Sequence, residues 1–100
     1  MSETVSNKRV YLNQYLDGQK HGFWVTCQKD GKVSETGWYR NGVKNRLWRY
    51  WDRSGKVRMD GLYFDGKKEG VWRYWNRDGE FVFRLVYKDG VKIDRKFPNM

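Results

Sequence analysis

The sequence predicts an all-β protein, an antiparallel meander of β-hairpin repeats with about eight strands. Three observations lead to this prediction. Side chains recur with a period of about 24 residues, turn signals recur about twice in each period, and aromatic residues make up 18% of a chain that has no alanine. Aromatic and β-branched side chains pack well on a pleated sheet, whereas alanine is the residue that helices favour most.

The period defines three tandem units. Tyrosine, glycine and tryptophan recur at equal intervals, at Tyr15, Tyr39, Tyr63 and Tyr87, at Gly18, Gly42, Gly66 and Gly90, and at Trp24, Trp48 and Trp72. The expected elements are an N-terminal strand over 8–14, repeats over 15–38, 39–62 and 63–86, and a C-terminal partial repeat over 87–97. We expect residues 1–100 to form one repeat domain.

Each unit carries two turn signals. Asp17-Gly18, Asn41-Gly42, Asp65-Gly66 and Asp89-Gly90 mark one end of the strands, and Asp30-Gly31, Ser54-Gly55 and Asp78-Gly79 mark the other. Asn-Gly and Asp-Gly suit the positive φ angles of two-residue type I′ hairpins. Two-residue turns throughout would place Trp24 opposite Gly37, and Glu35 opposite Trp48.

One face of the predicted sheet holds the core. The alternation of a strand places all three repeat tryptophans on it, together with Tyr50, Tyr74, Met59, Phe83, Val33, Val57 and Phe81. Gly37 and Gly61 fall opposite tryptophans, where the missing side chain leaves room for an indole to lie flat.

The opposite face combines arginine with the remaining tryptophans. Trp51 and Trp75 fall beside Arg49, Arg58, Arg73 and Arg84, and Arg49 is predicted to lie opposite Asp60 as a cross-strand pair. Guanidinium groups over indoles serve either as a protective layer on a thin sheet or as a binding surface. Both interpretations remain open.

The positive charge is concentrated in the second repeat. The chain has a net charge of +9, and repeat 39–62 contributes +5 from seven cations and two anions. We therefore predict that this repeat is the centre of recognition, because Trp and Arg are enriched among binding hot spots. The predicted partner-binding residues are Arg46, Arg49, Trp51, Arg53, Arg58, Arg73, Trp75 and Arg84. For Arg40, Lys44 and Lys56 we favour a different role, as ordinary cations that protect the sheet edge.

The segment from Tyr63 to Gly79, YFDGKKEGVWRYWNRDG, resembles the bacterial variant of the MORN repeat, found in YwqK-type antitoxin-like proteins. The resemblance covers about Tyr15 to Lys92. It implies a curved meander of hairpins that contacts proteins, sometimes lipids, and performs no catalysis. The chain departs from the pattern at Arg46, where the other repeats have Gly22 and Gly70.

The sequence offers little support for an enzyme. His21 is the one histidine and has no evident partner for acid–base chemistry. Cys27 is the one cysteine, so it cannot form an intramolecular disulfide, and we expect it to be a half-exposed structural thiol. No metal-ligand spacing or phosphate-binding glycine loop is recognisable, so we expect no cofactor.

A binding protein is the predicted function. The first interpretation is a module that covers an acidic surface of another protein, with inhibition as an antitoxin as one form of it. The second is binding of single-stranded nucleic acid, since cations and aromatic rings alternate. The third and weakest is attraction to an anionic membrane. We expect a cytoplasmic monomer with Lys8, Arg9, Lys92, Arg95, Lys96 and Pro98 blocking the two sheet edges.

Overall fold

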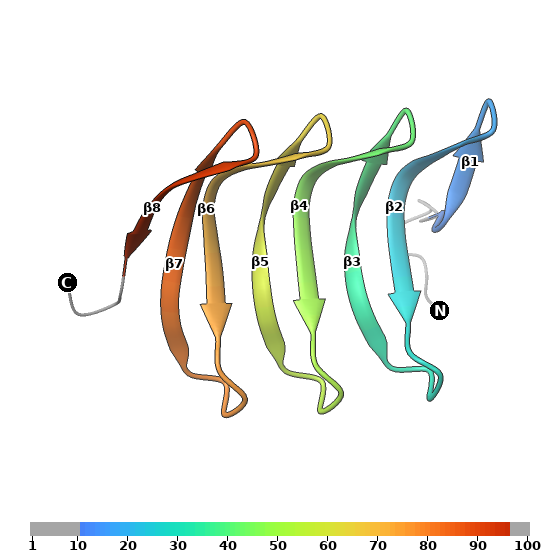
Figure 1. Ribbon diagram of the computed structural model, residues 1–100. Helices are drawn as coiled ribbons and strands as arrows, with labels where there is room; N and C mark the ends of the chain where they lie inside the picture. Colours follow the sequence, from blue (N-terminus) through green and yellow to red (C-terminus); the bar gives the residue numbers. More distant parts are fainter. Residues whose placement is uncertain (1–10, 97–100) are drawn as a thin grey trace, which may run out of the picture.

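The computed structural model of the chain describes residues 11–96 and confirms the predicted fold class (Figure 1). Eight antiparallel strands form one open sheet in chain order. The strands are β1 (Gln14–Leu16), β2 (Gln19–Cys27), β3 (Val33–Arg40), β4 (Val43–Trp51), β5 (Val57–Phe64), β6 (Lys67–Trp75), β7 (Phe81–Lys88) and β8 (Val91–Lys96). The radius of gyration is 16.0 Å. A compact domain of this length has about 13 Å, so the single layer makes the molecule elongated.

The two-residue hairpins form as predicted. Asn41 and Gly42 have φ angles of 53° and 82°, which is the type I′ pattern, and the equivalent residues of the other three hairpins also have positive φ. These hairpins lie along the upper edge in Figure 1. The tips of the last three hairpins bond to the preceding repeat, since the Gly42 N–H donates to the Lys20 carbonyl and Gly66 and Gly90 make the same contact with Lys44 and Lys68. Backbone hydrogen bonds therefore link neighbouring hairpins to one another as well as closing each hairpin.

The turns at the opposite end differ from the prediction. The Gly31 N–H donates to the Gln28 carbonyl and the Gln28 N–H to the Lys32 carbonyl, so the loop has three residues rather than two. This is a type I turn completed by a glycine at positive φ. The loops of Asp52–Lys56 and Asn76–Glu80 have the same bonds.

A β-bulge follows each of these loops and corrects one of our face assignments. The register shifts by one residue between Tyr50 and Trp51, so Val57 lies opposite Trp51. The same shift sets Phe81 opposite Trp75 and Val33 opposite Cys27. Because directly opposite residues share a face, the prediction that Val33, Val57 and Phe81 belong to the core face is wrong.

A wider irregularity lies in the middle of the sheet. Thr36 pairs with Arg49 but Trp38 pairs with Asn45, so the three residues 46–48 of β4 oppose one residue of β3. Glu35 consequently lies opposite Tyr50 and not opposite Trp48, the partner that we predicted. Arg46 has a φ of 66° at this point, and Gly22 and Gly70 have positive φ at the equivalent positions. The register shifts by two residues, which leaves the alternation of faces unchanged.

The core is a column of aromatic rings on one face, here named the tryptophan face: Trp24, Trp48 and Trp72 with Tyr15, Tyr39, Tyr63 and Tyr87. Successive rings meet edge to face, a favourable arrangement for aromatic pairs. Trp48 and Trp72 are 1% and 0% exposed. A Cβ atom on Gly37 would overlap the indole of Trp48, and one on Gly61 that of Trp72, so both glycines leave room for an indole as predicted. The indole belongs to the next repeat, however, and not to the tryptophan directly opposite each glycine.

Lysines lie over this column. The Lys44 Nζ atom lies 4.4 Å from the centre of the Trp48 ring, donates to the Tyr50 hydroxyl at 3.1 Å and pairs with Glu35 at 3.6 Å. Lys20 and Lys68 lie over Trp24 and Trp72 in the same way. The interpretation of Lys44 as an ordinary edge cation is therefore wrong, because its ammonium group makes a cation–π contact with the core.

The first strand begins later than predicted. Lys8 to Val10 lie outside the described residues, and within the described chain β1 begins at Gln14 instead of extending back through 11–13. The Asn13 side chain donates to the Val25 carbonyl at 3.0 Å and accepts from the Val25 N–H at 2.8 Å. One amide side chain thus takes the place of the next strand residue. At the other edge, Phe97 and Pro98 lie outside the described residues.

Candidate functional site

The side of the sheet opposite the aromatic column is here named the arginine face. Its centre is a cross-strand row in which register places Val25, Thr36, Arg49, Asp60, Arg73 and Arg84 next to one another on β2 to β7. Side chains directly opposite one another in a sheet are close enough to interact. The predicted pair of Arg49 and Asp60 is confirmed.

Asp60 is shared by two arginines. The Asp60 residue is 2% exposed. Arg73 donates from Nε and Nη2 to its two oxygens, both at 2.9 Å, and these bonds raise the pKa of the Arg73 guanidinium. Arg49 reaches only Oδ2, from Nε and Nη2 at 3.4 Å each. Arg73 therefore satisfies the buried carboxylate, while Arg49 remains the more weakly held cation.

Trp51 and Trp75 lie on the arginine face, pointing away from Trp48, as predicted. Both are half-buried. The three core tryptophans all donate their indole N–H to carbonyls, those of Gln14, Trp38 and Leu62. Within residues 11–93 no acceptor contacts the indole N–H of Trp51 or Trp75. Trp75 contacts Phe81 and Arg73, whereas Trp51 makes no ring or cation–π contact in this part of the chain.

Trp51 and Trp75 each line one side of a shallow groove. The first groove, of about 590 Å³, is lined by Trp51 with Val25, Lys32, Val33, Thr36 and Gly55. The second, of about 480 Å³, is lined by Trp75 with Arg49, Lys56, Val57, Asp60 and Gly79. Each residue of the second set lies one full repeat after its counterpart in the first, so the repeat builds the same groove twice. The first is mostly neutral, and the second carries the arginine row.

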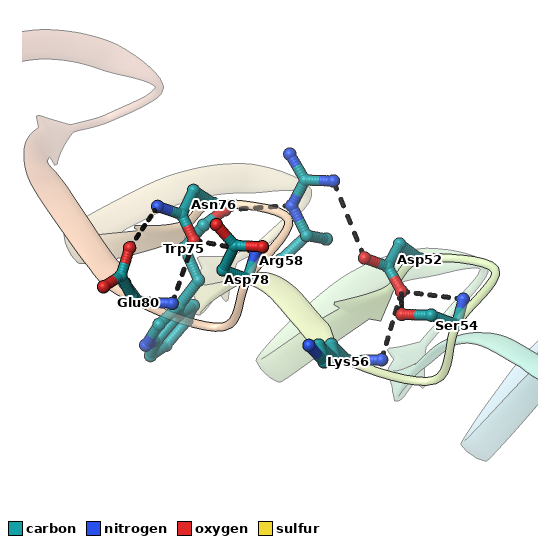
Figure 2. A network of polar contacts seen from close by, with 8 residues as sticks. All are labelled: Asp52, Ser54, Lys56, Arg58, Trp75, Asn76, Asp78 and Glu80. Carbon is teal, nitrogen blue, oxygen red and sulfur yellow. Dashed lines mark hydrogen bonds and ion pairs between the residues drawn. The ribbon is translucent and has the colours of Figure 1, made fainter.

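Arg58 is committed to the fold. Figure 2 shows it between two loops, with its Nε donating to the Trp75 carbonyl at 2.9 Å and its Nη1 atom 3.7 Å from Asp52. It occupies the extra position of the bulge in β5 and joins the second repeat to the third. Its side chain therefore holds neighbouring loops together instead of standing free for a partner.

The loops themselves are held by their first residues. Asp52 Oδ1 accepts from the Ser54 hydroxyl and from the Ser54 and Lys56 N–H groups (Figure 2). These bonds, chiefly that from the Ser54 hydroxyl, lower the pKa of Asp52. Asn76 makes the equivalent bonds to Asp78 and Glu80 in the third repeat.

The remaining predicted residues lie around this centre. Arg84 is exposed and follows Arg73 in the cross-strand row. Arg53 is exposed at the tip of the Asp52–Lys56 loop, beside the first repeat. Arg46 lies near the two-residue hairpins with its guanidinium 4.5 Å from the Trp38 ring centre. The structure thus brings together Arg49, Arg73, Trp75 and Arg84, with Trp51 in the adjacent groove, while Arg46 lies apart.

Sequence reasoning missed the groove walls. Lys32, Lys56 and the two valines were not assigned to the site, although the repeat places them at equivalent positions. An equal spacing along the sequence could have identified them: Trp51 follows Lys32 by the same number of residues as Trp75 follows Lys56. The bulge concealed it, because a regular strand would turn both valines to the opposite face.

Other kinds of site receive no support within the described chain. Residues 11–93 contain no cluster of three histidine, cysteine or acidic side chains that could hold a metal ion. Cys27 is exposed. Over residues 11–96 no helix has the length and apolarity needed to cross a membrane.

Comparison of the chain with models of protein families, with curated proteins and with solved structures finds no match.

Proposed function

We propose that this chain is a non-enzymatic protein-binding module that docks its arginine face on an acidic patch of a partner protein. One observation carries the proposal. The cross-strand row contains three cations, Arg49, Arg73 and Arg84, and one carboxylate, Asp60, which pairs with Arg49 and Arg73. Beside the row lie two indoles whose N–H groups have no acceptor within residues 11–93.

The chemistry of this surface suits carboxylates. A guanidinium group binds a carboxylate through two parallel hydrogen bonds, and a half-buried indole adds apolar area with a polar donor at its edge. Arg49 can rotate towards a partner's carboxylate without exposing an unpaired charge, because Arg73 already satisfies Asp60. A docked acidic patch would thus add contacts and leave the fold intact.

The resemblance of the repeat to the bacterial MORN variant supports the same proposal. Proteins with that repeat make contacts with other proteins, and a role as an inhibitor or antitoxin is one form that such a contact takes. We propose membership of that repeat family for this chain.

The proposal can be tested with two tryptophan variants of the full chain. Trp51→Ala should weaken binding of the partner protein by about 2 kcal/mol or more, since tryptophan side chains buried at an interface contribute much of its binding free energy. Trp48→Ala should instead lower the free energy of unfolding by about 3–5 kcal/mol, because it empties the core. Affinity is measured by titration calorimetry and stability by urea unfolding.

Capture from lysate with and without nuclease identifies the class of partner. A protein retained after nuclease treatment, and lost on Arg49→Ala but not on Lys88→Ala, supports the proposal, because both variants remove one positive charge. A partner lost with nuclease, whose affinity falls steeply with salt, would establish nucleic-acid binding in its place. Unchanged protein binding in Trp51→Ala would reject the arginine face as the interface.

A further inference from the structure

The two grooves of the arginine face lie at a fixed spacing from one another. The second groove lies one repeat after the first: β4 takes the place of β2 on one side, and Trp75 takes the place of Trp51 on the other. One repeat is two strands wide, and neighbouring strands lie about 4.7–4.9 Å apart, so equivalent points in the two grooves are about 9.6 Å apart. A ligand that uses both grooves must repeat its own contacts at that distance.

The polyproline II helix has this repeat. It makes one turn in three residues with a rise of about 3.1 Å each, so residues i and i+3 face the same way about 9.3 Å apart. A β-strand returns to the same side every two residues, at about 6.7 Å and 13.4 Å, and misses the second groove. An α-helix returns at i+7, about 10.5 Å along, which overshoots the spacing.

The groove walls favour proline at the repeating positions. Trp51 and Trp75 each form one wall, and Val33 and Val57 lie at equivalent positions in the two grooves. Proline-rich segments dock in grooves lined by aromatic residues, because their extended conformation is already formed before binding. The indole N–H of Trp51 and that of Trp75, which have no acceptor within residues 11–93, are donors for the carbonyls of such a segment, because a polyproline II helix makes no internal hydrogen bonds.

The rims favour acidic residues between the prolines. Lys32 lines the first groove, and Lys56, Arg49 and Arg73 line the second, against the single carboxylate of Asp60. Arg73 satisfies Asp60, so within residues 11–93 no acceptor fully satisfies Lys32, Lys56 or Arg49. Lys32 Nζ makes one long contact of 3.4 Å with the Arg53 carbonyl, and Arg49 donates to Asp60 Oδ2 at 3.4 Å. The charge of the site is therefore complementary to an acidic segment.

We propose that the two grooves bind one extended segment of the partner protein in the polyproline II conformation, with prolines at i and i+3 against Trp51 and Trp75 and acidic residues between them. This inference rests on the proposed function and specifies its ligand. The first repeat has Cys27 in place of a second tryptophan, so the site begins at the groove of Trp51.

The experiment uses the full chain and two labelled twelve-residue peptides of identical composition. One, the periodic peptide, is (Pro-Glu-Glu)₄, with proline at every third residue. The other, the control peptide, is (Pro-Glu)₄ followed by four glutamates, so that no two of its prolines are three residues apart. Fluorescence anisotropy should show the periodic peptide binding about tenfold more tightly than the control peptide, because only the former can place prolines in both grooves. The indole N–H resonances of Trp51 and Trp75, assigned with Trp51→Phe and Trp75→Phe, should shift on titration while those of Trp48 and Trp72 stay fixed.

Variants then locate the contact. Trp51→Leu and Trp75→Leu, which retain an apolar side chain but remove the ring and its N–H donor, should each weaken binding of the periodic peptide about tenfold. Lys88→Ala should change its affinity less than twofold.

Three results would overturn the inference. Equal affinity for both peptides, with a loss in Arg49→Ala, would mean that acidic residues are recognised without the spacing, in which case the proposed function stands alone. If neither peptide shows saturable binding, an acidic proline-containing segment is not the ligand of the grooves. Tighter binding of a twelve-residue oligothymidylate, shifting the same indole resonances, would assign the grooves to nucleic acid and reject the proposed function too.

Discussion

At the scale of single residues, Arg46 occupies a backbone conformation that the other repeats give to glycine. Its φ is 66°, against 83° for Gly22 and 75° for Gly70. A side chain in the left-handed region costs about 1–2 kcal/mol, because its Cβ crowds the following carbonyl. The second repeat thus places its guanidinium over Trp38 at the expense of backbone strain.

The strain predicts an ordering of two variants. Arg46→Gly and Arg46→Ala both lose the contact with Trp38, but only the glycine relieves the backbone. The free energy of unfolding should therefore be about 1 kcal/mol higher for Arg46→Gly than for Arg46→Ala, measured by urea unfolding.

Gly70→Ala provides the matched control. A Cβ atom at Gly70 meets no atom within 4 Å, so its expected cost of about 1–2 kcal/mol comes from φ alone. Equal stability of the two Arg46 variants would show that β4 relaxes to another conformation at this point.

At the scale of elements, β2 is protected at its outer edge by a side chain. The two bonds between the Asn13 amide and Val25 satisfy backbone groups that a longer β1 would otherwise pair. Unpaired strand edges invite association with other chains. Asn13 itself has a φ of 56°, a conformation that asparagine tolerates better than alanine.

Removal of this amide should both destabilise the sheet and open its edge. We expect Asn13→Gly, which keeps the backbone conformation, to lower the free energy of unfolding by about 1–2 kcal/mol through the two lost hydrogen bonds. Asn13→Ala should cost more because of its φ. Urea unfolding measures the loss, and analytical ultracentrifugation reports whether the exposed edge causes self-association; an unchanged stability in Asn13→Gly would contradict the proposed capping.

At the scale of the whole molecule, one aromatic column connects the repeats and links stability to pH. Burial raises the pKa values of Tyr50, Tyr63 and Tyr74 above the ordinary value of tyrosine. In the unfolded chain these hydroxyls ionise near pH 10. A raised folded-state pKa contributes stability that is fully present below that pH and is lost as the pH rises above it.

The free energy of unfolding should therefore fall above about pH 10, by up to about 1.4 kcal/mol per pH unit for each of the three tyrosines. Urea unfolding between pH 8 and 12 measures the slope, and phenolate absorbance identifies tyrosine as its source. Tyr63→Phe should reduce the slope by the contribution of one tyrosine. An unchanged slope in that variant would assign the loss to other groups, such as the lysines over the column.

Much of the fold could be predicted because the evidence for it is periodic. Tyrosine, glycine and tryptophan at equal intervals along the chain predict the number of strands and the hairpin ends, and the structure has eight strands in chain order. Trp48 and Trp51 point to opposite faces of the sheet because side chains alternate between the two faces along a strand. The spacing of residues along the chain determines these features, so they could be predicted without knowledge of the packing.

The site was only partly predictable. Arg49, Trp51, Arg73, Trp75 and Arg84 lie on the predicted face, but Arg58 is engaged in a bridge between loops. The valines of the grooves were assigned to the wrong face because the loops have three residues and each is followed by a bulge. An Asp-Gly or Ser-Gly pair suits either loop length, and the choice depends on the hydrogen bonds that close it.

The sequence by itself determined the repeat, the class of the fold and which tryptophans form the core, since these depend on spacing and on the two-residue period of a strand. Only the tertiary structure decided the register across the irregular pairs, the sharing of Asp60 between Arg49 and Arg73, and the pairing of equivalent grooves. These depend on contacts between strands, where a shift of one residue changes which side chains meet.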